Sequence, residues 1–143
     1  MTSEQIALAQ SSFAQVIPIA DTAAALFYGR LFELAPELRP LFKGELQEQG
    51  RKLMRMIGLA VKSLDQWETL APVLRDLGQR HEQYGVREQD YDTVGAAMLW
   101  TLEQGLGPSF TPEVKAAWVA VYARITGVMQ RATARTQRLD HAA

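Results

Sequence analysis

Apolar residues recur along most of this chain at intervals of three and four, the spacing that gathers them on one face of an α-helix. No stretch shows the strict alternation of apolar and polar residues that marks a half-buried strand. The pattern therefore predicts an all-α protein. Its predicted helices cover residues 4–17, 19–35, 46–64, 67–85, 90–106 and 112–136, and a short turn follows the second of them, from Pro36 to Phe42.

Residues that favour helix ends support these boundaries. Thr2 or Ser3 can cap the first helix, and Gly85 suits the end of the fourth. Thr111 can cap the last helix, which has a proline in its first turn. The chain contains no repeat or linker, so we expect a single domain over residues 1–143, with a frayed tail from about residue 133 onward.

One polar residue interrupts the fourth apolar stripe. The stripe that runs from Trp67 to Leu77 reaches His81 at its next position, and two other predicted helices carry similar exceptions, Tyr28 and Gln49. Each residue alone is most simply explained as a core or packing side chain, because a buried histidine is usually satisfied by a backbone carbonyl. Together they provide one nitrogen ligand and two hydrogen-bond donors around an apolar space, which suits a metal cofactor with a bound polar ligand.

Composition limits the classes of partner. The 143 residues carry a formal net charge of −1, which gives no electrostatic reason to expect a nucleic acid or an anionic membrane. Neither a secretory signal nor a membrane-spanning apolar run is visible, so we expect a cytoplasmic protein.

The ligand inventory limits the kind of metal centre. The chain has no cysteine, and His81 and His141 are its two histidines, so a protein-only zinc site is disfavoured. Neither histidine follows a glutamate by three residues, as a carboxylate-bridged di-iron bundle requires. A porphyrin supplies four of the iron ligands itself and needs a single histidine from the protein.

Seven motifs follow one another along the chain, and they are Leu26–Leu34, Pro36–Phe42, Arg51–Met54, Leu77–His81, Tyr91–Gly95, Leu106–Pro112 and Ala116–Trp118. In this order they resemble the globin family. The likeness covers nearly the whole chain, is close to neuroglobin through the last two helices, and pairs Tyr28 with Gln49 as bacterial single-domain globins and the globin domain of flavohemoglobins do. It implies a globin fold of about seven helices (A, B, C, E, F, G and H) and a haem b cofactor.

The resemblance implies a role for each matching residue. It makes His81 the proximal iron ligand, Tyr28 and Gln49 the distal pair, and Phe42 the ring packed on the haem face. Leu53, Leu77, Val86, Tyr91 and Val94 are the implied haem-lining residues, and Lys52 or Arg80 would reach a propionate unless both belong to an ordinary solvated face.

The implied function is reversible oxygen binding at a five-coordinate haem. A phenol and an amide would each stabilise a partly anionic oxygen ligand by about 1.5 to 3 kcal/mol, and neutral carbon monoxide would gain less. Glutamine is a poor iron ligand, so the sixth position should stay open. The alternative is a nitric oxide dioxygenase supplied by a separate reductase, since 143 residues leave no room for flavin and nicotinamide domains. A haem-free globin-fold sensor or interaction module is a third hypothesis.

Two departures from these relatives bear on structure and mechanism. Only six residues separate Phe42 from Gln49, which predicts a very short connection between the C and E helices and no D helix. Tyr91 matches a tyrosine that accompanies a glutamate behind the proximal histidine of flavohemoglobins, but Thr133 stands at the place of that glutamate. We therefore expect the imidazole N–H to meet a backbone carbonyl near Leu77, and peroxidase activity is disfavoured.

Overall fold

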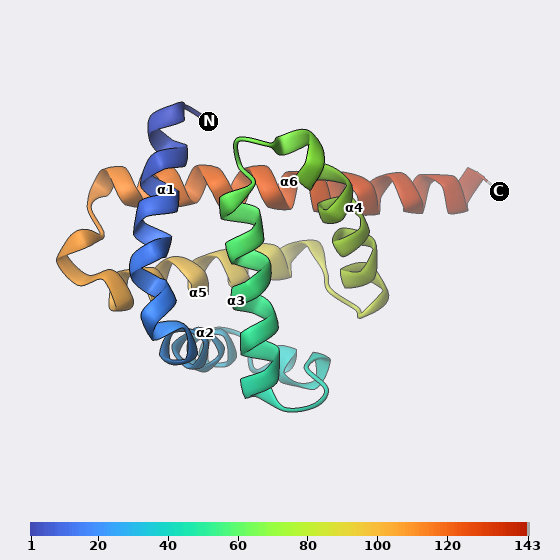
Figure 1. Ribbon diagram of the computed structural model, residues 1–143. Helices are drawn as coiled ribbons and strands as arrows, with labels where there is room; N and C mark the ends of the chain where they lie inside the picture. The colour runs from blue at the N-terminus through green and yellow to red at the C-terminus, as the bar shows by residue number, and fades with distance from the viewer. Residues whose placement is uncertain (143) are drawn as a thin grey trace.

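The computed structural model describes residues 1–142, with side chains described for residues 1–132. Over residues 1–142 the chain is all-α, as the apolar spacing predicts, and contains no strand. Its helices are α1 (Ser3–Val16), α2 (Ala20–Leu34), α3 (Leu46–Lys62), α4 (Trp67–Gln83), α5 (Glu88–Leu106) and α6 (Pro112–Ala142), drawn in Figure 1. Three short 3₁₀ segments accompany them: η1 (Ile17–Ile19), η2 (Pro36–Leu41) and η3 (Gly107–Ser109). None of the helices within this range is long and apolar enough to cross a membrane.

The first helix begins at the predicted cap. The Thr2 hydroxyl accepts the backbone N–H of Gln5 at 3.0 Å, and the Gln5 side-chain oxygen accepts the Thr2 N–H at 3.1 Å. This reciprocal pair satisfies two backbone donors that a helix start otherwise leaves open. The prediction offered Thr2 or Ser3, and the structure selects Thr2.

The last helix also begins as predicted but ends later. The Thr111 hydroxyl accepts the N–H of Val114 at 3.2 Å and so caps α6. The predicted end near residue 136 is too early, because α6 runs to Ala142 and the sequence beyond 136 has no proline or glycine to end it. The side chains of residues 133–143, where the sequence predicts a frayed tail, lie outside the described residues.

The connection between η2 and α3 is very short, as the spacing predicts. Only residues 42–45 separate the two elements, and within this described segment there is no D helix. Gly44 has a φ of +98°, a left-handed conformation that costs other residues steric strain. The predicted C helix is a 3₁₀ segment rather than an α-helix, and Pro40 inside it has no backbone N–H to donate to the carbonyl four residues earlier.

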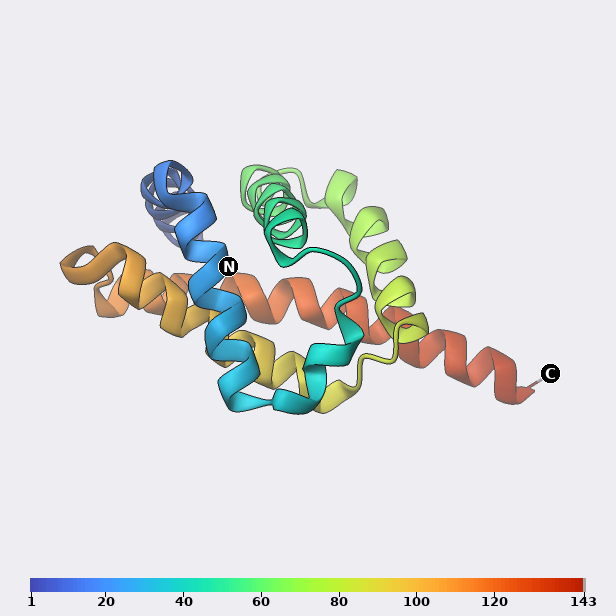
Figure 2. The same cartoon turned by 90° about the horizontal axis from the view of Figure 1, so that it is seen from below.

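The helices pack in two sets that meet along α5 and α6. Helices α1 and α4 both lie against α6, whereas α2 packs on α3 and α5 (Figures 1 and 2). Helices α3 and α4 follow one another in the sequence but have different main partners, since α3 packs on α1 and α2 and α4 packs on α6. The sides of α3 and α4 that face one another are therefore not packed together as a helix pair.

Two apolar clusters matter for the site. We call the first the α2 cluster and the second the α4 cluster. The α2 cluster consists of Phe27, Tyr28, Leu31, Ala35, Leu38 and Ala97, and the α4 cluster consists of Ala60, Leu70, Leu74, Tyr91, Val128 and Met129.

Candidate functional site

His81 occupies the last turn of α4, and the end of that helix determines its position. The Val86 N–H donates to the His81 carbonyl at 3.0 Å, and the Gly85 N–H donates to the Glu82 carbonyl at 3.0 Å. This pair of bonds is the Schellman motif, and it needs Gly85 at a φ of +90°. The bond from Val86 ends on the carbonyl of His81 itself. The turn therefore holds the backbone of His81 directly.

The imidazole ring of His81 has one nitrogen occupied and one available. Its Nδ1 lies 2.9 Å from the Leu77 carbonyl oxygen, which can only accept, so Nδ1 carries the proton. Nε2 is then the nitrogen with a free lone pair, the form in which histidine binds metals. This contact confirms the predicted carbonyl partner near Leu77.

The electrostatic surroundings of His81 favour the neutral ring. Burial lowers the pKa of His81 below its ordinary 6.5, the bond to Leu77 opposes that effect, and the charge of Arg80 adds to the lowering. At neutral pH the ring is therefore uncharged. A neutral imidazole with Nδ1 already protonated is ready to coordinate through Nε2.

Tyr28 lies in α2 with its ring buried among other aromatic rings. The residue is 6% exposed, and its ring centre lies 5.2 Å from that of Phe27 and 5.3 Å from that of Phe42. Within the described part of the chain, no group forms a hydrogen bond with its hydroxyl. Burial raises the pKa of Tyr28 to about 12, so the phenol keeps its proton. The phenol therefore remains able to donate a hydrogen bond to a bound ligand.

Gln49 lies in the first turn of α3 and is half-buried. Its side-chain amide donates to the Lys43 carbonyl oxygen at 3.3 Å, in the short connection that precedes the helix. Within the described residues it forms no bond with Tyr28. The structure therefore places Gln49 on the helix that packs against α2, with its amide directed to the connection.

Gly50 is a residue that the sequence alone did not single out. It is buried, and a Cβ atom built there would lie 2.8 Å from the Ala24 Cβ and 3.7 Å from a ring carbon of Tyr28. A side chain larger than hydrogen would push α3 away from α2, since real Cβ contacts are longer than 3 Å. A glycine inside a predicted helix, next to a candidate site residue, is the sequence signal that indicates such a close approach.

Both apolar clusters have partly exposed apolar side chains at their edges. Phe42, Leu53 and Val94 pack at the edge of the α2 cluster, while Leu77 and Val86 pack at the edge of the α4 cluster. All five are only partly buried although they are apolar. A flat hydrophobic group with one metal to coordinate would cover such surfaces and use the free Nε2 of His81, so the residues present fit a porphyrin.

Tyr91 lies at the start of α5 and belongs to the α4 cluster. Its backbone carbonyl accepts a short hydrogen bond from the Tyr122 hydroxyl. Burial raises the pKa of Tyr91, and the nearby charge of Glu82 raises it further. The Thr133 side chain, which bears on the predicted absence of a glutamate behind His81, lies outside the described residues.

The two cations predicted at the rim are both exposed. Arg80 forms an ion pair with Asp76 one turn earlier in α4, at 2.7 Å, and Lys52 lies on the exposed side of α3. A different arginine, Arg87, joins the end of α4 to η2 and α5, because it contacts Glu37 at 3.9 Å and the buried Asp90 at 3.1 Å. Sequence reasoning missed Arg87, whose importance depends on a contact with a distant segment.

Comparison with known proteins identifies the family. The profile of the globin family matches residues 25–129. The chain belongs to the globin family. Membership implies haem binding, and the fit of His81 and the surrounding apolar side chains is consistent with it.

Two kinds of relative have sequences similar to this globin. Neuroglobin of Danio rerio is 33% identical over 124 residues, which cover 77% of this chain and 78% of that protein. A flavohemoprotein of Rhizobium meliloti (strain 1021) is 31% identical over 106 residues, which cover 72% of this chain and 26% of that longer protein.

A solved structure shares the fold. It is an engineered carbene transferase, described as a putative nitric oxide dioxygenase from Rhodothermus marinus, and it superposes with a TM-score of 0.87 over 97% of both chains at 22% sequence identity. At that level of identity the likeness supports the globin fold alone.

Proposed function

We propose that this globin holds haem b through His81 and reversibly binds oxygen at the opposite face, where Tyr28 donates a hydrogen bond to the ligand. Carbon monoxide and nitric oxide are further diatomic ligands of the same site. The observation that carries the proposal is the Tyr28 hydroxyl, a protonated donor in a buried ring that no described residue satisfies. The hydroxyl oxygen is not among the fully buried side-chain atoms that lack a partner, so it can be reached from outside and can donate to a ligand.

The proximal residues would hold the cofactor in a definite orientation. Haem b, when bound, would supply an iron atom that takes one nitrogen ligand from the protein and binds a diatomic gas. His81 Nε2 would bind the iron while the Leu77 carbonyl keeps Nδ1 protonated and the ring in place. A neutral carbonyl withdraws less of the Nδ1 proton than a carboxylate does, which favours gas binding over peroxide cleavage.

The distal residues would select the ligand by hydrogen bonding. A phenol donates most strongly to a ligand atom with negative charge, and each such bond contributes about 1.5 to 3 kcal/mol. Gln49 would strengthen this effect if its amide left the Lys43 carbonyl, which is an exposed bond that water can replace. Glutamine has no strong metal-binding atom, so Gln49 would leave the iron open to gas.

The test compares Tyr28→Phe with the unchanged protein, using the rate of oxygen dissociation measured by stopped flow. Loss of one hydrogen bond to a partly charged ligand should accelerate dissociation by about tenfold or more. Tyr84→Phe is the matched control, because Tyr84 is 63% exposed at the end of α4 and its loss should leave the rate unchanged. Equal rates in Tyr28→Phe and the unchanged protein would refute the distal assignment.

Nitric oxide dioxygenase activity is a second candidate, favoured by the similarity to a flavohemoprotein. In that function Tyr28 would hold the oxygen ligand while nitric oxide is converted to nitrate, and a reductase would restore ferrous iron between turnovers. The test is sustained nitrate production with nitric oxide, oxygen, reduced nicotinamide and a flavin reductase. Nitrate formed once per haem, without further turnover, would rule against the enzymatic function.

A further inference from the structure

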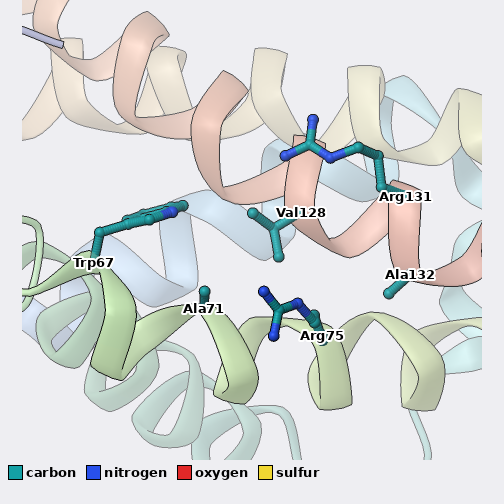
Figure 3. Close-up of a pocket in the computed structure, with 6 residues that line it drawn as sticks. All are labelled: Trp67, Ala71, Arg75, Val128, Arg131 and Ala132. Carbon is teal, nitrogen blue, oxygen red and sulfur yellow. The ribbon is translucent and has the colours of Figure 1, made fainter.

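A pocket of about 250 Å³ lies between α4 and α6, among residues that the proposed gas site does not use. Its apolar part is formed by Trp67 and small aliphatic side chains, and two arginines border it (Figure 3). Trp67, Ala71 and Arg75 come from α4, and Val128, Arg131 and Ala132 come from α6.

The two arginines are arranged around the apolar floor. In Figure 3 the side chains of Arg75 and Arg131 both run toward the Trp67 end of the pocket, with Val128 between them. Gly127 allows the Arg131 orientation, because a Cβ built there would lie 3.3 Å from an Arg131 guanidinium nitrogen. A larger residue at 127 would crowd the guanidinium in this position.

The positive charge at this pocket has no protein counterion among the described residues. Among the side chains of residues 1–132, no carboxylate lines the pocket or forms an ion pair with Arg75 or Arg131. The nearest acidic neighbour in sequence, Asp76, is already paired with Arg80 at 2.7 Å. A third guanidinium, that of Arg124, lies 3.9 Å from the centre of the Trp67 ring and adds to the positive potential.

We propose that this pocket binds a small amphiphilic carboxylate, with its carboxylate between Arg75 and Arg131 and its apolar body on Trp67 and Val128. Each guanidinium presents parallel N–H groups that match the two oxygens of a carboxylate. The apolar floor would contribute through burial of the alkyl or aryl body. Neither inorganic anions nor neutral apolar compounds satisfy both parts of the pocket.

The experiment is isothermal titration calorimetry of the haem-loaded protein with three probes. Octanoate carries both the acidic head and the apolar body, acetate carries only the head, and octanol carries only the body. We expect octanoate to bind at least about tenfold more tightly than acetate or octanol, since each lacks one set of contacts. Absence of octanoate binding, or equal binding of octanoate and octanol, would overturn the proposal.

Variants locate the binding at this pocket and exclude the haem site. Arg75→Gln combined with Arg131→Gln should weaken octanoate binding by about tenfold or more, and both positions are exposed, so the fold should tolerate the change. Arg55→Gln on the exposed side of α3 is the control and should leave octanoate binding unchanged. Ala71→Leu should also weaken binding, because it fills the floor without removing charge. Unchanged octanoate affinity in the double arginine variant would place the binding elsewhere and contradict the assignment.

Discussion

The proposed function assigns His81 and Tyr28 to opposite sides of one haem, and different kinds of contact hold the two residues. Hydrogen bonds within α4 and its terminal turn fix His81, since Leu77, Gly85 and Val86 all lie within five residues of it. Tyr28 is positioned by packing between elements, and its hydroxyl meets no described partner. On the proposed function, local structure therefore prepares the proximal side, whereas a ligand would supply the missing acceptor on the distal side.

The largest expected effect is on the proximal side, in His81→Ala. Removal of the iron ligand should shift or abolish the Soret band. It should also accelerate haem loss more than about a hundredfold, because loss of a group that only hydrogen-bonds to a metal ligand already weakens metal binding by up to that factor. Absorption spectroscopy during transfer of haem to an excess of apomyoglobin measures both effects. An unchanged spectrum would show that another group coordinates the iron.

A large effect on stability is expected where α4 meets α6. A Cβ built on Gly78 would lie 2.5 Å from the Met129 carbonyl oxygen, so Gly78→Ala should lower the free energy of unfolding by about 1 to 3 kcal/mol. Gly29→Ala in α2 is the matched control, because nothing lies within 4 Å of its Cβ position. That change should raise the free energy of unfolding by about 0.5 to 1 kcal/mol. Urea denaturation of both variants tests the difference, and a destabilised Gly29→Ala or an unaffected Gly78→Ala would contradict it.

A smaller effect is expected for the second distal residue. Gln49→Leu should accelerate oxygen dissociation by less than about tenfold, and by less than Tyr28→Phe does, because its amide must first leave the Lys43 carbonyl. Gln47→Leu, on the exposed side of the same helix, is the control. Stopped-flow measurements on these variants rank the two distal donors. A larger effect of Gln49→Leu than of Tyr28→Phe would reverse the proposed order.

The smallest expected effect concerns pH. Since burial raises the pKa of Tyr28 to about 12, oxygen dissociation should change by less than about twofold between pH 7 and 10. The unfolded chain loses this proton near pH 10, before the folded protein does, so the free energy of unfolding should fall as pH rises from about 10 toward 12. An increase in dissociation rate with a midpoint near pH 8 or 9 would show that the phenol ionises too early to act as the donor.

Much of the fold and the proximal side could be predicted because those features are local. The cap at Thr2, the reversal at Gly85 and the His81 contact with Leu77 all depend on residues within one or two helical turns. Helix spacing therefore indicates them without knowledge of the tertiary structure.

Features that depend on distant segments were harder to predict. Two contacts join separate elements, one between Gly50 and Ala24 and one between Arg87 and Glu37. A single sequence does not show which distant residues come into contact. The Gln49 amide donates to the Lys43 carbonyl because the connection before α3 is short. The residue types alone do not reveal this contact. The end of α6 was placed too early for a different reason, since polar residues weakened the apolar pattern without ending the helix.

The most direct test of the proposed function is repeated oxygenation of the unchanged, haem-loaded ferrous protein, followed by absorption spectroscopy. We expect a five-coordinate spectrum without gas, complete conversion to an oxygenated form under air, and return to the first spectrum under argon through several cycles. A six-coordinate spectrum without gas, or oxidation to ferric haem in the first cycle, would contradict reversible oxygen binding at an open site beside Tyr28.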